Sequence, residues 1–169
     1  MHPEPLRSTC TATVVGGDWP DRCRPVEDRE PFRSCVRRWR DGLSWEATGA
    51  YDLYLSLIDK RQAPVDGCST REDLRQRFDQ LDRLFDQVEQ EGQLRTRSEL
   101  PGASFRELGG VLVHIDNDVR PVFGRVGWHR FAIAKILDLE VAPAVIGVVH
   151  PDALATWRSS YLRRSPATR

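Results

Sequence analysis

Residues 111–150 read VLVHIDNDVRPVFGRVGWHRFAIAKILDLEVAPAVIGVVH, and this stretch decides the fold. Its first five residues, Val111–Ile115, are β-branched and mostly apolar, which predicts a buried strand. Asp116-Asn117-Asp118 predicts a turn, so the chain would return as the second arm of a hairpin. The patterns that follow predict a returning strand, a glycine loop, a short apolar helix and a further strand, in that order, over residues 120–123, 124–127, 128–139 and 141–150.

The residues before this stretch predict helices. Ser44 is a candidate N-cap for a helix that would include Tyr51 and Tyr54. A clearer helix follows, because Ser69 and Glu72 have the spacing of a capping box and Gly92 is a natural stop. Its apolar residues recur at steps of three and four and predict one buried stripe, made of Leu74, Phe78, Leu81, Phe85 and Val88. Only one short β-like run, residues 11–15, precedes these helices, and the tail after residue 150 predicts a single helical turn near residues 154–157.

Composition limits the classes of function. Lys and Arg together number 25 and so do Asp and Glu, which gives a formal net charge of zero. A dedicated nucleic-acid-binding protein usually carries a basic excess, because neutralising phosphates drives its affinity. The balance therefore disfavours DNA binding, and the arginines at residues 33–40 are better explained as a solvated helical face.

The cysteines and the hydropathy pattern bear on the compartment. Cys10, Cys23, Cys35 and Cys68 are widely and irregularly spaced, so they do not predict a zinc site. The first residues lack a basic segment followed by an apolar run, and no apolar stretch approaches the roughly 20 residues needed to cross a bilayer. We therefore expect a cytoplasmic protein that has no cysteine-based zinc site and does not contact a membrane.

The segment Phe123-Gly124-Arg125-Val126-Gly127-Trp128-His129-Arg130 carries the chemistry. Its two glycines allow a ligand to approach the backbone closely. The first N–H groups of the helix that follows have no partner within the helix, and the helix dipole favours an anion there. Arg130 offers a planar fork of donors and His129 offers one or two more. This arrangement predicts a site for phosphate groups, although an arginine after a glycine-rich turn often only pairs with an acidic side chain. The expected ligand-binding residues are Gly124, Arg125, Val126, Gly127, Trp128, His129 and Arg130.

The same residues resemble a known box. Gly127-Trp128-His129-Arg130 and the alanine-containing helix after it, followed by Leu139 and Pro143, resemble the glycine–arginine box of the ParB/sulfiredoxin superfamily. The resemblance covers about residues 70–150, including the helix and glycine at residues 84–92 and the hairpin. It implies an α+β fold, with a small mixed β-sheet of ParB/sulfiredoxin type and a helical N-terminal half. It also implies three segments: an arm with helices (1–69), the ParB/sulfiredoxin-like domain (70–150) and a basic tail (151–169).

The superfamily performs several tasks, so the fold alone does not choose a function. Sulfiredoxins have a cysteine immediately before the His-Arg pair, where this chain has Trp128, and an indole cannot replace a thiolate. Partition-type ParB proteins bind CTP here and read DNA with a later helix-turn-helix region, for which few residues remain after His150. The free-serine kinase branch has the His-Arg pair, so the resemblance implies a phosphotransferase that uses ATP, ADP or CTP with Mg²⁺ on a small polar acceptor. A nucleotide-sensing or partner-binding module and a DNA-binding protein are the alternatives.

Phosphoryl transfer also requires a group that accepts the proton of the attacking hydroxyl. Glu107 and Asp116 flank the first strand and are the carboxylate candidates, and His129 is the third catalytic candidate. Such carboxylates are more often solvated surface groups, so the base is not assigned. A metal site built from His114, Asp116 and His150 is a weaker alternative.

Overall fold

The computed structural model describes residues 12–23, 25–96, 99–100 and 110–164. The protein folds into two compact units, and each is assembled from segments that are separate in the sequence. We call residues 1–24, 97–127 and 143–169 the sheet unit, and residues 25–96 and 128–142 the helical unit. The chain therefore passes from one unit to the other inside the predicted phosphate-binding segment, between Gly127 and Trp128.

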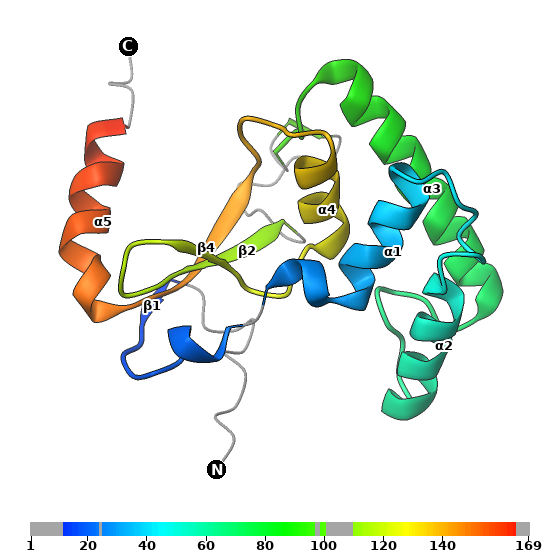
Figure 1. The fold of residues 1–169 in the computed structure, drawn as a ribbon, viewed down its shortest axis with the longest axis horizontal. Helices are drawn as coiled ribbons and strands as arrows, with labels where there is room; N and C mark the ends of the chain where they lie inside the picture. Colours follow the sequence, from blue (N-terminus) through cyan, green and yellow to red (C-terminus); the bar gives the residue numbers. More distant parts are fainter. Residues whose placement is uncertain (1–11, 24, 97–98, 101–109, 165–169) are drawn as a thin grey trace. The chain divides into compact units, whose positions relative to one another are not determined.

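The sheet unit contains a mixed sheet with the strand order β1-β4-β2-β3 (Figure 1). Strand β4 is parallel both to β1 and to β2, whereas β2 and β3 are antiparallel. The hairpin and the last strand therefore agree with the sequence prediction, and the protein is a mixed α+β fold. The strands are β1 (Thr13–Val14), β2 (Val111–Ile115), β3 (Pro121–Phe123) and β4 (Ala144–Val149).

The tail after β4 forms a longer helix than predicted. Helix α5 (Pro151–Arg164) has 14 residues, whereas the sequence suggested a single turn. Ala153 is fully buried, and Leu154 and Trp157 pack on the same apolar cluster as Ile115 and Val149. These positions are separated by one, three and four residues, so α5 covers part of the sheet with one face.

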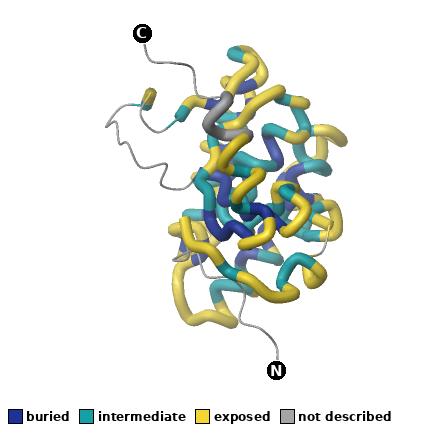
Figure 2. The backbone as a smooth tube through the Cα atoms, turned by 90° about the vertical axis from the view of Figure 1, so that its left-hand side faces the viewer, coloured by how far each residue is buried: buried dark blue, intermediate teal, exposed yellow. Residues whose placement is uncertain are grey.

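The helical unit contains α1 (Glu30–Trp39), α2 (Ala50–Arg61), α3 (Arg71–Glu91) and α4 (Trp128–Ile136). The predicted apolar stripe of α3 is buried, and its aromatic members stack on tryptophans: Phe85 on Trp39 and Phe78 on Trp45. The stripe packs on the other helices of this unit. Buried segments lie inside and exposed segments outside, as Figure 2 shows for the described residues.

Two predicted helix starts are displaced. The capping box of α3 is formed by Thr70 and Asp73, one residue after the predicted pair Ser69 and Glu72. Helix α2 begins at Ala50, six residues after Ser44, and Ser44 instead accepts a hydrogen bond from the amide of Ala47 in a preceding turn. The predicted stop of α3 is confirmed, because Gly92 is its C-cap in the left-handed conformation.

A tight turn lies between α2 and α3. Asp66 and Gly67 both have positive φ, at 52° and 78°. Val65 and Cys68 exchange two backbone hydrogen bonds around them, of 2.9 and 3.0 Å. This turn therefore holds the Asp66 carboxylate at a defined place beside α3.

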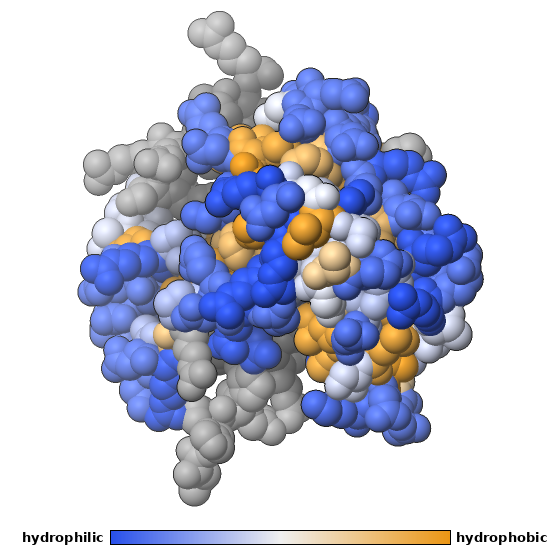
Figure 3. Space-filling model, turned by 45° about the vertical axis from the view of Figure 1, so that its right-hand side comes forward, coloured by the Kyte–Doolittle hydropathy of each residue, from blue (hydrophilic) through white to orange (hydrophobic). Residues whose placement is uncertain are grey.

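The division at residues 69 and 150 stays a prediction about sequence segments, since the compact units follow other boundaries. Among the described helices, none is both long and apolar enough to pass through a membrane. Figure 3 shows one face of the molecule, on which hydrophobic residues appear in separate areas between hydrophilic ones. The large hydrophobic side chains most exposed in the described residues are Val14, Leu43 and Val141.

Candidate functional site

The two glycines of the predicted site are required by the packing of the sheet unit. A Cβ at Gly127 would lie 2.6 Å from the carbonyl oxygen of Gly110 and 2.9 Å from the Cα of Val111, and φ there is +80°. A Cβ at Gly124 would lie 2.7 Å from the side chain of Leu112. Both glycines therefore allow the loop to lie directly against β2. This close packing explains the glycine at each position, whether or not a ligand binds there.

The loop is tied to β2 by its backbone. The amide of Gly124 donates to the carbonyl of Leu112 at 2.7 Å, and the amide of Leu112 donates to the carbonyl of Val126 at 3.2 Å. Arg125 lies between these two bonds with φ at +65°, in the left-handed region that most side chains avoid. Its side chain is exposed. The loop thus presents one cation to solvent from a fixed backbone.

The residues after Gly127 belong to the helical unit, and Trp128 packs there beside its apolar core. His129 is buried, and its side chain points into that core. Its Nε2 lies 3.2 Å from the hydroxyl of Tyr54 on α2, and its Nδ1 lies 3.6 Å from Oδ2 of Asp66. Burial lowers the pKa of His129, Arg77 lowers it further, and Asp66 opposes both. His129 is therefore a neutral core residue, contrary to its expected role as a donor to phosphate.

Arg130 also contacts the helical unit. Its Nη2 donates to the backbone carbonyl of Arg95, in the segment after α3, at 2.6 Å. At least one of the donors expected to face phosphate is therefore directed to the protein.

Of the two carboxylate candidates, Asp116 belongs to the hairpin turn between β2 and β3. Oδ1 of Asp116 accepts hydrogen bonds from the amides of Asp118 and Arg120, at 2.9 and 2.7 Å, and so closes the hairpin turn. Glu107 lies outside the described residues. The structure therefore gives both residues structural contacts: Asp116 closes the hairpin turn and His129 lies in the helical core.

Sequence reasoning missed a polar cluster around His129. The Asp66 carboxylate accepts a hydrogen bond from Nε of Arg77 at 2.9 Å. The cluster consists of four side chains from four elements: Tyr54 of α2, Asp66 of the tight turn, Arg77 of α3 and His129 of α4. An available signal was the spacing of His129, Ala132, Ile133 and Ile136, which places the histidine on the apolar stripe of α4. An open depression of about 410 Å³ lies beside the cluster and is lined by Asp66, Gly67, Cys68, Asp73, Gln76, Arg77 and Gln80.

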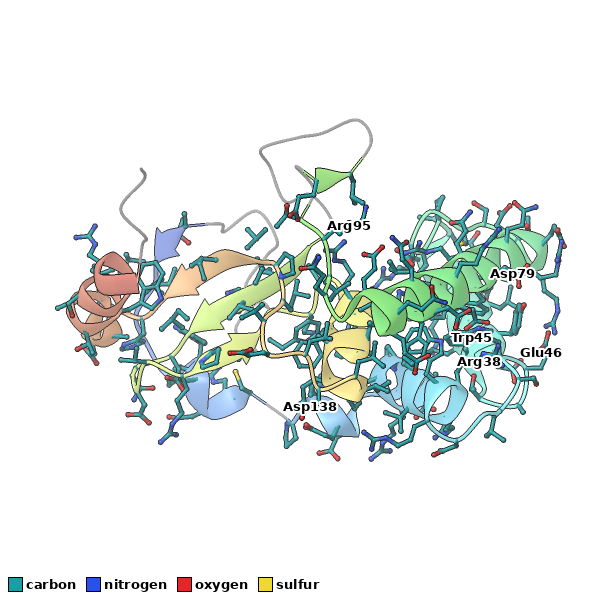
Figure 4. All side chains as sticks on the ribbon, turned by 90° about the horizontal axis from the view of Figure 1, so that it is seen from above. Arg38, Trp45, Glu46, Asp79, Arg95 and Asp138 are labelled. Atoms are coloured by element: carbon teal, nitrogen blue, oxygen red, sulfur yellow. The ribbon has the colours of Figure 1, made fainter. Side chains whose placement is uncertain are left out.

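A second cluster centres on Asp82 of α3. Its carboxylate accepts from Nε and Nη2 of Arg38 at 3.1 and 2.7 Å, and from the indole N–H groups of Trp39 and Trp45 at 2.9 and 3.1 Å. Figure 4 shows Arg38 and Trp45 next to each other beside α3. Both carboxylate oxygens are occupied, so this cluster holds α1 and the turn before α2 on α3.

In the sheet unit, His114 occupies a slot formed by glycines. A Cβ at Gly147 would lie 2.4 Å from its Nδ1, and that Nδ1 accepts a hydrogen bond from the amide of Val148 at 2.9 Å. The rings of Trp19 and His114 are 6.0 Å apart, and Trp19 lies 6.3 Å from His150. Trp19 therefore anchors the N-terminal arm to this unit. Across the described part of the chain, His, Cys, Asp and Glu form no group of three that could hold a metal ion.

Comparisons with known proteins identify no relative. No family model matches the chain, no curated protein matches it, and no solved structure matches it. The resemblance to the ParB/sulfiredoxin superfamily thus rests on the residues and the order of elements alone.

Proposed function

We propose that the segment 124–130 binds the phosphate groups of a nucleotide, ATP, ADP or CTP with Mg²⁺, through its backbone amides and the Arg125 guanidinium, as part of a ParB/sulfiredoxin-like protein. The observation that carries this proposal is a loop that is hydrogen-bonded to β2 on both sides of Arg125 and presents the Arg125 guanidinium to solvent. A fixed loop binds an anion without first losing conformational freedom, and an arginine offers two parallel donors to phosphate oxygens.

The contacts of His129 and Asp116 favour binding without turnover. Both ring nitrogens of His129 face side chains of the helical unit, and Oδ1 of Asp116 closes its own turn, so two of the three candidate bases have structural contacts. A nucleotide-binding module that acts as a switch or a docking domain is therefore our first assignment. Phosphoryl transfer to a small polar acceptor remains the enzymatic alternative, with Glu107 as its remaining candidate base.

Ion pairs weigh against DNA as the ligand. The helical arginines that could have formed a basic surface already pair with carboxylates: Arg33 with Asp28, Arg37 with Glu30 and Arg38 with Asp82. Arginines that already pair with carboxylates displace few counterions from DNA. The displacement of those counterions supplies most of the non-specific affinity for DNA. These ion pairs and the net charge of zero support a small anionic ligand. We also propose that the protein is cytoplasmic.

Isothermal calorimetry with each nucleotide and Mg²⁺ tests the proposal. Arg125→Ala should weaken binding about tenfold, because one charge-assisted hydrogen bond is lost. Arg158→Ala is the matched control, since Arg158 is another exposed arginine of the sheet unit, and it should leave the affinity unchanged. The proposal fails if the wild-type protein binds none of the three nucleotides.

An acceptor-phosphorylation assay under the same conditions separates the two assignments. Nucleotide binding without formation of a phosphorylated acceptor supports the non-catalytic module. Transfer of the phosphoryl group to an added hydroxyl compound, with the shortened nucleotide as the second product, would instead support the phosphotransferase if Glu107→Gln abolishes it.

A further inference from the structure

The buried histidine of α4 has a hydrogen-bonding environment that determines its protonation. A neutral imidazole has one N–H donor and one lone pair, and either nitrogen can carry the proton. Nδ1 faces Oδ2 of Asp66 at 3.6 Å, and an ionised carboxylate only accepts hydrogen bonds. A lone pair at Nδ1 would face this negative charge directly, so the proton belongs on Nδ1.

The other ring nitrogen then has a matching donor. With Nδ1 protonated, Nε2 carries the lone pair, and the hydroxyl of Tyr54 lies 3.2 Å from it in a buried position. The two rings are also stacked, with an angle of 22° between their planes. The Tyr54 hydroxyl therefore donates to His129 at 3.2 Å, and the N–H at Nδ1 of His129 is directed towards Asp66 at 3.6 Å, which is longer than a hydrogen bond.

The titratable and charged groups around the imidazole come from three elements. Tyr54 on α2 stays protonated, because burial raises the pKa of its hydroxyl. Asp66 in the tight turn is paired with Arg77 on α3 through a 2.9 Å contact. Arg77 opposes a second positive charge nearby, so the pair Asp66–Arg77 is compatible with a neutral imidazole.

We infer that Tyr54, His129 and Asp66 form a relay with a fixed tautomer that positions the first turn of α4, which makes His129 a positioning residue and not a ligand of phosphate. All three residues lie in the helical unit, so the relay itself is independent of any ligand. Its consequence for binding rests on the proposed function: the relay would hold the helix whose first amides receive the phosphates.

Long-range ¹H–¹⁵N NMR of the full chain, labelled at histidine, tests the relay without nucleotide. The expected result is an Nδ1–H tautomer for His129 that does not titrate between pH 7.5 and about pH 6, below its ordinary midpoint of about 6.5. An Nε2–H tautomer, or a titration with the ordinary midpoint, would overturn the inference.

Tyr54→Phe and Tyr51→Phe are a matched pair, since both tyrosines are buried on α2 and both ring edges meet Phe78. Removing the Tyr54 hydroxyl should change the tautomer equilibrium of His129 and increase hydrogen exchange of the α4 amides about five- to tenfold. Removing the Tyr51 hydroxyl should leave both unchanged. Equal behaviour of the two variants contradicts the relay.

Adding Mg²⁺-ADP to the labelled protein separates the relay from the proposed function. If calorimetry shows binding and the His129 ring signals stay in place, both ideas are supported. If no nucleotide binds while the Nδ1–H tautomer is present, the proposed function fails and the relay stands. If nucleotide binding transfers the proton to Nε2, His129 is a phosphate ligand and the relay is wrong.

Discussion

The two halves of the segment 124–130 are held in place by different interactions. Gly124 to Gly127 are held by backbone contacts with β2, and the absence of a Cβ makes these contacts feasible. Trp128 to Arg130 are held by side chains, which reach Tyr54 and a carbonyl of the helical unit. A motif that is continuous in sequence thus combines two structural requirements, and substitutions should affect its halves differently.

The largest effect should come from Gly127→Ala. The new Cβ would meet backbone atoms at 2.6 and 2.9 Å, and it would also occupy a left-handed conformation. Backbone atoms cannot move aside as a flexible side chain does, so we expect a loss of about 3–4 kcal/mol in the free energy of unfolding. Urea denaturation followed by circular dichroism measures this loss.

Gly92→Ala is the control, since Gly92 also has positive φ but a Cβ there would meet nothing within 4 Å. It should cost only about 1 kcal/mol. If both variants lose the same free energy, close packing against β2 does not explain the glycine at residue 127.

The helical unit should instead be sensitive to a polar side chain. Asp82→Ala removes the acceptor of Arg38, Trp39 and Trp45 and leaves their partly buried donors without it. We expect a loss of about 2–3 kcal/mol in the free energy of unfolding. Asp79→Ala on the exposed side of α3 should change it by less than about 0.5 kcal/mol in the same urea titration, because its ion pair is solvated. A small effect at Asp82 would show that packing of the tryptophans suffices.

The pH dependence of the free energy of unfolding should reveal the buried imidazole of His129. Burial lowers the pKa of His129, so below about pH 6.5 the unfolded chain takes up a proton that the folded chain does not. The free energy of unfolding should therefore fall, by about 1–2 kcal/mol, between pH 6.5 and about pH 5. Denaturation at each pH measures this slope.

His129→Gln should make that slope shallower. A smaller contribution of the same sign remains, because burial also lowers the pKa of His114 in the sheet unit. Carboxyl groups with a lowered pKa, such as Asp73 at the start of α3, lose their contribution only below about pH 4. An unchanged slope in His129→Gln would contradict the neutral buried imidazole.

The smallest effect on stability should come from Arg125→Ala. Its side chain is exposed, and alanine keeps the same left-handed backbone at a similar cost. The free energy of unfolding should change by less than about 0.5 kcal/mol in thermal or urea denaturation. A large loss would mean that the guanidinium supports the loop itself, and a fall in nucleotide affinity would then need another explanation.

Local sequence predicted most elements because their signals are local. The β-branched run of β2 is followed directly by the turn at Asp116, and the apolar stripe of α3 is followed closely by its terminal Gly92. The start of α3 was displaced by one residue because Ser69 and Thr70 each have an acidic residue three positions later. Which of the two pairs forms the capping box depends on the residue at which α3 begins in the folded unit, and there the pair is Thr70 and Asp73.

The orientation of side chains depended on the tertiary structure. His129 and Tyr54 are 75 residues apart, and their contact forms only when α4 packs beside α2. The same holds for Arg38 and Asp82, which are 44 residues apart. Spacing identified His129 as part of a box but could not show whether it faces a ligand or the core.

Local patterns in the sequence were sufficient to specify the order of elements from β2 to β4, the apolar stripe of α3 and the glycine loop. These features depend on backbone conformation and on the alternation of apolar residues, which each short segment specifies alone. The tertiary structure decided that the segment 124–130 divides between two units and that its histidine is buried. Both outcomes depend on burial and hydrogen bonding between residues far apart in the chain, which no local pattern encodes.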